Sequence, residues 1–292
     1  MAVQAFYDLP APAKLNLFLH VTGRRPDGYH LLQSVFILID WADTLHVERR
    51  TDGLLRRHDL GAALPADDLS LRAARALQHA TGCPFGADIS VLKSVPWGAG
   101  MGGGSSDAAT VLLALNRLWN LNLPRARLLE LATPLGADVP FFVGGDNAFV
   151  EGIGDRLTPI EWAPRRYAVV KPAESVGTAG IFSHPDLARD TESATVVGSL
   201  AHMNAELESA GNPAFGHNDL QPVAQALCPP IEQVAQWLDS RFGNSRMTGS
   251  GSAVFARVDA EGASWPEGEL PGGWTGRMCR SLAHHPLRAW AD

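Results

Sequence analysis

The chain has 292 residues, of which 46% are hydrophobic and 19% are charged, and its 24 Lys and Arg against 31 Asp and Glu give a formal net charge of −7. This apolar fraction excludes a mainly disordered chain, and the acidic balance argues against a nucleic-acid partner, because phosphate backbones are held by clustered Lys and Arg. Its 3 cysteines exclude a disulfide framework, and the longest apolar run, residues 35–39, is about a quarter of a membrane span. With no signal peptide evident, we expect a cytoplasmic protein without a membrane partner, and its oligomeric state stays open.

The first predicted elements are two strands. Alternation of side chains predicts a strand from Pro12 to His20, in which Lys14 and Asn16 lie on the same face. A turn signal at residues 23–28 separates this strand from a second one at about 31–39. Taken alone, a strand lysine such as Lys14 is usually solvated.

A helix and a third strand follow. Asp67 or Asp68 can cap a helix that runs to about Ala80 and stops at Gly82, and alternation then predicts a strand at residues 89–95. A glycine-rich string leads from this strand into a helix predicted at 108–118 from its apolar spacing. Because two or three strands precede any helix, the order favours an α+β fold over a repeating βαβ array.

Turn residues then separate two halves of the chain. A new strand is predicted at residues 167–171, so we expect two domains, at residues 1–160 and 161–292. The second half is expected to contain a helix near residues 231–238 and a loop around 260–273.

The string Pro96-Trp-Gly-Ala-Gly-Met-Gly-Gly-Gly-Ser-Ser-Asp107 carries the clearest chemistry. Its glycines leave backbone N–H groups unshielded and permit positive φ, and the helix that follows offers further N–H groups at its positive end. A packing turn is the alternative, but five glycines in seven positions cost more chain entropy than such a turn requires. We predict a site for nucleotide phosphates made by Pro96, Gly98, Gly100, Gly102, Gly103, Gly104, Ser105 and Ser106.

Several known classes of phosphate-binding loop can be excluded for this string. No Walker A motif is present, and the H-R-D and D-F-G signatures of protein kinases are absent. The spacing of Gly98, Gly100 and Gly103 matches the dinucleotide fingerprint, but the second strand ending in an acidic residue about 20 positions later is missing. A nicotinamide oxidoreductase is therefore a distant alternative.

Several strings together resemble one enzyme family. Three of them, in order, resemble the motifs of the small-molecule kinases that include galactokinase, homoserine kinase, mevalonate kinase and phosphomevalonate kinase: Pro12–Leu17, Pro96–Asp107 and Thr248–Ser252. Three more narrow the resemblance to the family of 4-diphosphocytidyl-2-C-methyl-D-erythritol kinases: Arg25–His30, Gly136–Pro140 and Asn218–Leu220. The resemblance covers residues 12 to about 256.

The resemblance implies transfer of the γ-phosphate of ATP to the 2-hydroxyl of a methylerythritol unit linked to cytidine diphosphate. It also implies two α+β domains with ATP and this small-molecule partner meeting in the cleft between them. Mg²⁺ is expected to bridge the phosphates. Its protein ligands stay unknown, although Ser105 or Ser106 could contribute one.

The resemblance assigns Asp138 and Lys14 to catalysis. Asp138 lies between Gly136-Ala137 and an apolar Val139-Pro140-Phe-Phe run, and from the residues alone it could equally be a turn cap. By resemblance Asp138 is the base for the attacking hydroxyl, and Lys14 is the neighbouring cation that keeps it ionised.

Substrate contacts also follow from the resemblance. It implies that His30 hydrogen-bonds the edge of cytosine, while Tyr29 and Phe182 stack on its faces. Without it, Tyr29 and His30 would be a structural aromatic and an ordinary surface histidine. Further contacts are expected from Asn16, Thr178, Gly249, Ser250 and Gly251, although from the residues alone a packing turn is the better interpretation of the last three.

Other readings stay open. A kinase for another small alcohol would keep the same motifs, and a non-catalytic nucleotide-binding protein would need neither Asp138 nor Lys14. Lys93 is expected to be a solvated strand residue, and Asn218-Asp219 a helix cap.

Overall fold

The computed structural model describes residues 3–196, 198, 216–258 and 270–292. The strands in this part of the chain form two sheets, and helices pack on each of them. Helices and strands alternate irregularly along the chain, which confirms the predicted α+β class. No helix in the described ranges is long and apolar enough to cross a membrane.

The first sheet is mixed, with its strands in the order β3-β4-β2-β5-β6 and with β1 also paired to β2. Its strands are β1 (Ala5–Arg24), β2 (His30–Arg50), β3 (Leu55–Asp59), β4 (Gly86–Leu92), β5 (Ala148–Glu151) and β6 (Arg156–Pro159). The strands β3 and β4 run parallel, and the other pairs are antiparallel.

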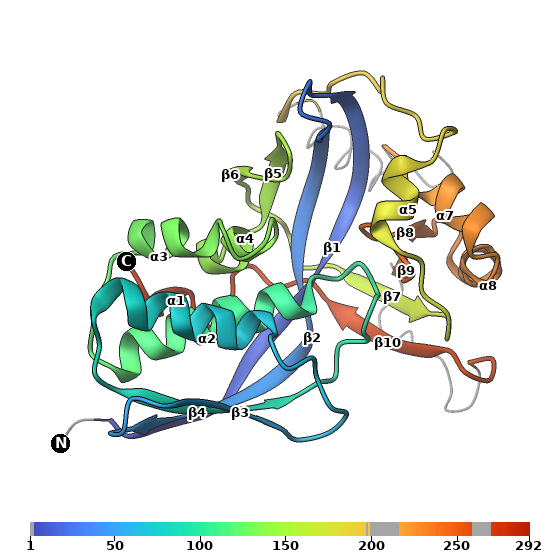
Figure 1. Cartoon of the computed structure of the whole chain (residues 1–292). Helices are drawn as coiled ribbons and strands as arrows, with labels where there is room; N and C mark the ends of the chain where they lie inside the picture. The colour runs from blue at the N-terminus through green and yellow to red at the C-terminus, as the bar shows by residue number, and fades with distance from the viewer. Residues whose placement is uncertain (1–2, 197, 199–215, 259–269) are drawn as a thin grey trace.

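The strands β1 and β2 form a long antiparallel ribbon that passes between the two halves of the molecule (Figure 1). The predicted strands at 12–20 and 31–39 lie within them, but both elements are much longer. Register shifts interrupt the pairing at four places, and such irregularities let a ribbon bend. As a result Leu9 lies in the core of the first half, whereas Val21 lies in the core of the second.

Four helices accompany the first sheet: α1 (Leu69–Thr81), α2 (Gly103–Leu118), α3 (Arg125–Ala132) and α4 (Val139–Gly144). The predicted caps of α1 are confirmed, since the Asp68 side chain accepts the N–H of Leu71 and Gly82 ends the helix with a φ of 62°. The helices α1 and α2 lie side by side on the first sheet (Figure 1), where α1 contacts β3 and α2 contacts β1 and β2. This packing fixes α2, and with it the glycine string at its N-terminus.

The second sheet has the order β10-β7-β9-β8. Its strands are β7 (Arg166–Lys171), β8 (Arg246–Met247), β9 (Val254–Val258) and β10 (Thr275–Arg280), and its helices are α5 (Thr178–Ser183), α7 (Gln221–Leu227) and α8 (Pro230–Phe242). The predicted strand at 167–171 and helix at 231–238 are confirmed. The loop expected at 260–273 lies mostly outside the described residues.

The change from one sheet to the other falls between Pro159 and Arg166. The end of the chain then returns to the first sheet, where Leu287 and Ala291 join the core around α2 and a short 3₁₀ helix, η1 (Arg288–Trp290), follows. The division into domains at residue 160 stays a prediction, and these last residues pack across that line.

Candidate active site

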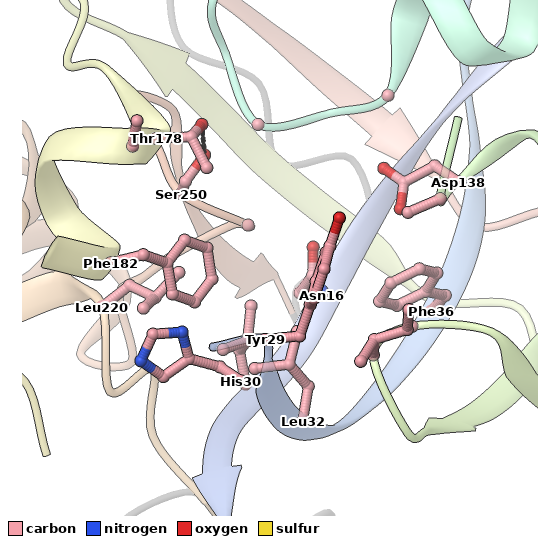
Figure 2. A pocket seen from close by; sticks show the side chains of 18 of the residues that line it. Asn16, Tyr29, His30, Leu32, Phe36, Asp138, Thr178, Phe182, Leu220 and Ser250 are labelled. Carbon is pink, nitrogen blue, oxygen red and sulfur yellow. Dashed lines mark hydrogen bonds between the residues drawn. The ribbon is translucent and has the colours of Figure 1, made fainter. Parts of the chain in front are cut away.

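A cavity of about 760 Å³ lies where the β1–β2 ribbon meets elements of both halves. Figure 2 shows His30 and Phe182 on one side of it, and Asp138 and Phe36 on the other. Of the residues predicted to take part in catalysis or substrate binding, all but Gly251 line this cavity: Lys14, Asn16, Tyr29, His30, Asp138, Thr178, Phe182, Gly249 and Ser250.

Lys14 and Asp138 form an ion pair at one end of the cavity. The Lys14 Nζ lies 3.8 Å from Asp138 Oδ2, donates to Asn16 Oδ1, and sits 4.7 Å from the centre of the Phe36 ring. Lys14 is 3% exposed, so it is not the solvated residue that a strand lysine alone suggests. Burial lowers its pKa, and the nearby Asp138 carboxylate opposes that shift.

Asn16 is held by hydrogen bonds in an orientation that serves Lys14. Its backbone N–H donates to Thr248 Oγ1 over 2.9 Å, and its side-chain NH₂ donates to Ser34 Oγ over 3.0 Å. With the amide group used in this way, the side-chain oxygen faces the Lys14 ammonium group. The network joins β1 and β2 to the loop before β9.

The opposite end of the cavity is aromatic. The rings of His30 and Phe182 have centroids 5.0 Å apart, and Arg189 donates from Nε to His30 Nε2 over 3.1 Å. Burial, together with the charges of Arg189 and Arg24, lowers the pKa of His30, which favours the neutral imidazole. Tyr29 is 61% exposed, so its ring is free to cover a flat ligand.

The glycine string adopts the conformation that its composition predicts. Gly98, Gly100 and Gly102 have φ values of 64°, 72° and 71°, a region that side chains disfavour. A second cavity of about 380 Å³ lies against this string, and Gly100 and Gly102 line both cavities. Predicted phosphate-binding residues that line the second cavity are Pro96, Gly98, Gly100, Gly102, Gly103 and Gly104.

The last glycine turn supports the phosphate loop from behind. The Ser252 N–H donates to the Gly98 carbonyl over 2.9 Å, and a Cβ on Gly249 would come within 2.6 Å of the Gly100 carbonyl oxygen. Ser250 exchanges a hydrogen bond of 2.6 Å with Thr178 at the rim of the first cavity. Gly251 lines neither cavity and faces Met247, so the geometry gives it a packing position.

The site has the features that a nucleoside triphosphate requires. The first turn of α2 offers N–H groups that have no acceptor within the helix, and the positive end of the helix dipole favours an anion. Ser105 lines the first cavity, whereas Ser106 is completely buried and lines neither. The described ranges contain no group of three His, Cys, Asp or Glu residues that could hold a metal ion.

A buried charge cluster beneath the phosphate loop is missing from the sequence-based predictions. Lys93 donates to Asp107 Oδ2 over 2.6 Å and also to Asp43, and its side chain is 17% exposed. The expectation of a solvated Lys93 is therefore wrong. Burial raises the pKa of Asp107, an effect that Lys93 opposes and Asp43 reinforces. In the sequence, the only residue that could have indicated this charge cluster was Asp107, the acidic residue at the end of the glycine string.

Asn218 makes contacts beyond the expected one at the start of a helix, where its Oδ1 accepts the Leu220 N–H over 2.9 Å. Its side-chain NH₂ donates to the carbonyls of Met247 and Gly249, both over 2.8 Å, and α7 begins at Gln221, three residues after Asn218. Asp219 accepts the Val21 N–H over 2.6 Å. The pair thus holds the last glycine turn and β1 in addition to the turn that leads into α7.

Comparisons with known proteins agree with this geometry. Residues 68–146 match the family model for the GHMP kinases N terminal domain, and residues 197–264 match that for GHMP kinases C terminal. A protein of Methylibium petroleiphilum named 4-diphosphocytidyl-2-C-methyl-D-erythritol kinase is 62% identical over 100% of both chains. A protein of the same name from Polaromonas naphthalenivorans is 57% identical over 99% of this chain and 97% of its own.

Solved structures show the same fold. The crystal structure of a 4-(cytidine 5'-diphospho)-2C-methyl-D-erythritol kinase superposes with a TM-score of 0.75 at 36% identity, over 86% of this chain and 90% of that one. A homoserine kinase from Cytophaga hutchinsonii, at 15% identity, shares the fold with a TM-score of 0.67 over 98% of this chain and 96% of its own. The chain therefore belongs to the GHMP kinases, a family of ATP-dependent small-molecule kinases, and within it to the relatives named 4-diphosphocytidyl-2-C-methyl-D-erythritol kinase.

Proposed function

We propose that this protein phosphorylates the 2-hydroxyl of 4-diphosphocytidyl-2-C-methyl-D-erythritol, with Asp138 as the base and Lys14 as its cationic partner. The observation that carries the proposal is one continuous cavity with two chemically different ends. His30 and Phe182 form an end suited to a flat base, and Asp138 lies at the end beside the glycine string. A substrate with cytosine at one end and an alcohol at the other fits this arrangement.

Binding begins with the base. Phe182 and the exposed Tyr29 offer rings for stacking, a contact that any base can make. Selectivity between bases comes from the edge of the His30 ring. The groups that link the base to the alcohol also need polar contacts. Asn16 offers one beside Lys14, and the hydrogen-bonded pair Thr178 and Ser250 offers others. These contacts fix the alcohol near the carboxylate of Asp138.

Proton transfer and charge stabilisation follow from the ion pair. ATP supplies the transferred phosphoryl group, and ADP leaves as the new bond to the substrate oxygen forms. Asp138 accepts the hydroxyl proton, while Lys14, 3.8 Å from the carboxylate, stabilises negative charge at the reacting oxygens. A Cβ on Gly102 would come within 3.4 Å of Asp138 Oδ2, so the phosphate loop and the base are neighbours.

The phosphates are held by the chain's amides. The loop at residues 98–104 and the first turn of α2 donate N–H groups, and Ser105 adds a hydroxyl that lines the first cavity. Mg²⁺ neutralises phosphate charge in reactions of this kind, and Ser105 is the side chain that would contribute a ligand. We propose that the protein works in the cytoplasm, where its cysteines, free in the structure, stay reduced.

Asp138→Asn tests the assignment. The amide keeps the shape of the side chain but cannot take the proton, so we expect the kcat for the cytidyl substrate to fall by about 10²- to 10⁴-fold with an unchanged substrate Kd. Steady-state ADP release gives kcat, and calorimetry gives Kd. The matched control is Asp52→Asn in the turn after β2, where Asp52 pairs with Arg50. An Asp138→Asn enzyme with wild-type kcat and intact binding would show that another group is the base.

A further inference from the structure

Arg189 lies behind the base-binding end of the cavity, which it does not line. All five N–H bonds of its guanidinium group find acceptors. Nε donates to His30 Nε2 over 3.1 Å, and the other N–H groups donate to backbone carbonyls: Phe182 (3.2 Å), His184 (2.8 Å), Pro185 (3.5 Å) and Leu187 (2.8 Å). The group is therefore fixed in place by the end of α5 and the segment that follows.

This contact determines the protonation of His30. A guanidinium group can only donate hydrogen bonds, and it keeps its protons at any physiological pH. The Nε2 atom of His30 must therefore be the unprotonated acceptor, so in a neutral ring the proton is on Nδ1. The charges of Arg189 and Arg24 and the burial of the ring, which lower the pKa of His30, favour that neutral form.

The remaining ring nitrogen is left for a ligand. His30 lines the cavity, and within the described residues Nδ1 has no protein hydrogen-bond partner. A ligand at this end therefore meets a hydrogen-bond donor. Cytosine presents an acceptor at N3, whereas uracil presents an N–H there, so a fixed donor discriminates between the two bases.

We infer that Arg189 is a positioning residue for base selection, which fixes His30 as the Nδ1–H tautomer and so favours a cytosine over a uracil compound. The inference about base selection rests on the proposed function for the cytidyl substrate. The assignment of the His30 tautomer does not depend on that function. Because the same guanidinium also binds the Phe182 carbonyl, one side chain holds both the stacking element and the edge-reading ring.

The tautomer can be measured without turnover. We expect ¹⁵N NMR of the wild-type protein, with the His30 signal assigned through His30→Gln, to show a protonated Nδ1 and an unprotonated Nε2 near pH 7.5. In Arg189→Met the donor is lost, so the signal should shift toward the Nε2–H form. Arg189→Lys keeps a donor and a charge and should restore much of the wild-type signal.

Selectivity gives the second readout. The ratio of kcat/KM for the cytidyl substrate to that for its uridine diphosphate-linked counterpart should fall at least about tenfold in Arg189→Met, because the base edge then meets a ring without a fixed donor. Arg125→Met is the matched control. Arg125 binds the carbonyls of Val143 and Gly144 away from the cavity, so its loss should lower stability and leave the ratio unchanged.

Specific outcomes overturn the inference. A wild-type His30 with its proton on Nε2 would do so directly, even if Arg189→Met fails to fold. So would an Arg189→Met protein in which the tautomer and the cytidine-to-uridine ratio stay as in the wild type and only stability falls. If the wild type does not phosphorylate the cytidyl compound at all, the proposed function fails, and the NMR result still decides the tautomer.

Discussion

His285 is a buried histidine outside the active site, 2% exposed, whose Nδ1 accepts the N–H of Leu287 over 3.0 Å. Burial, with a smaller effect of the Arg125 charge, lowers its pKa from 6.5 to about 4. Between these two pH values the unfolded chain binds a proton that the folded protein does not. His285 therefore contributes stability that is fully present above pH 6.5 and is lost as the pH falls toward 4.

His285→Asn should reduce this pH dependence. Asparagine can still accept the Leu287 N–H but does not titrate, so the loss of unfolding free energy between pH 6.5 and 4 should be smaller by about 3 kcal/mol than in the wild type. Burial also lowers the pKa of His20 to about 4, and His20 therefore adds the same pH dependence to the stability of the wild type and of His285→Asn. Urea unfolding at several pH values measures the difference.

The matched control is His79→Asn, which removes an exposed histidine at the end of α1 and leaves His285 untouched. Identical profiles for His285→Asn and the wild type would mean that His285 is not held neutral in the folded protein.

Individual site residues were predictable where the motif itself carries the chemistry. The glycines of the phosphate loop belong to this group, whereas the role of Asp138 came from the family resemblance and stays a prediction. Lys14 was not predictable from its strand alone, because the Thr248 side chain that bonds its neighbour Asn16 comes from 232 residues further along the chain. Lys93 was missed for the same reason, since Asp43, which binds it, lies on β2.

Two glycine-rich loops act together at the scale of elements. Gly100 has a φ of 72°, and a Cβ there would overlap the Thr248 carbonyl oxygen and lie 2.9 Å from the Gly251 nitrogen. These neighbours are backbone atoms, which cannot rotate out of the way. The contact explains why both strings are rich in glycine, and it joins the phosphate loop to the second half of the chain.

Gly100→Ala should therefore separate the loops. We expect the free energy of unfolding to fall by at least about 1 kcal/mol from the left-handed backbone alone, and ATP binding to weaken as the loop amides move. Urea unfolding and calorimetry with ATP measure the two effects. Gly144→Ala is the control, because a Cβ there meets nothing within 4 Å, and it should be neutral or slightly stabilising. A Gly100→Ala protein with wild-type stability and ATP affinity would refute the close contact.

Elements with a strong local signal agree with the structure. The caps of α1 and the glycine loop before α2 are examples, because propensity and chain geometry act over a few residues. The full extent of β1 and β2 was not predictable, since it depends on pairing along a bent ribbon with shifted register. Asn218 likewise holds a turn about 30 residues away, and sequence spacing alone gives no sign of this.

The whole molecule places the two ends of the proposed substrate on different parts of the chain. Phe182 belongs to α5 beside the second sheet, whereas Asp138 precedes α4 beside the first. The β1–β2 ribbon supplies Lys14, Asn16 and His30 between them. The return of residues 281–292 to the first sheet adds a further link that composition and motifs did not predict.

The central claim is that this cavity selects a cytidine-linked alcohol, and a coupled ADP-release assay tests it most directly. Wild-type protein is given ATP with 4-diphosphocytidyl-2-C-methyl-D-erythritol, and separately with mevalonate or homoserine as the acceptor. We predict ADP release with the cytidyl compound and none above background with the other two. ADP release with mevalonate or homoserine, and not with the cytidyl compound, would contradict the account.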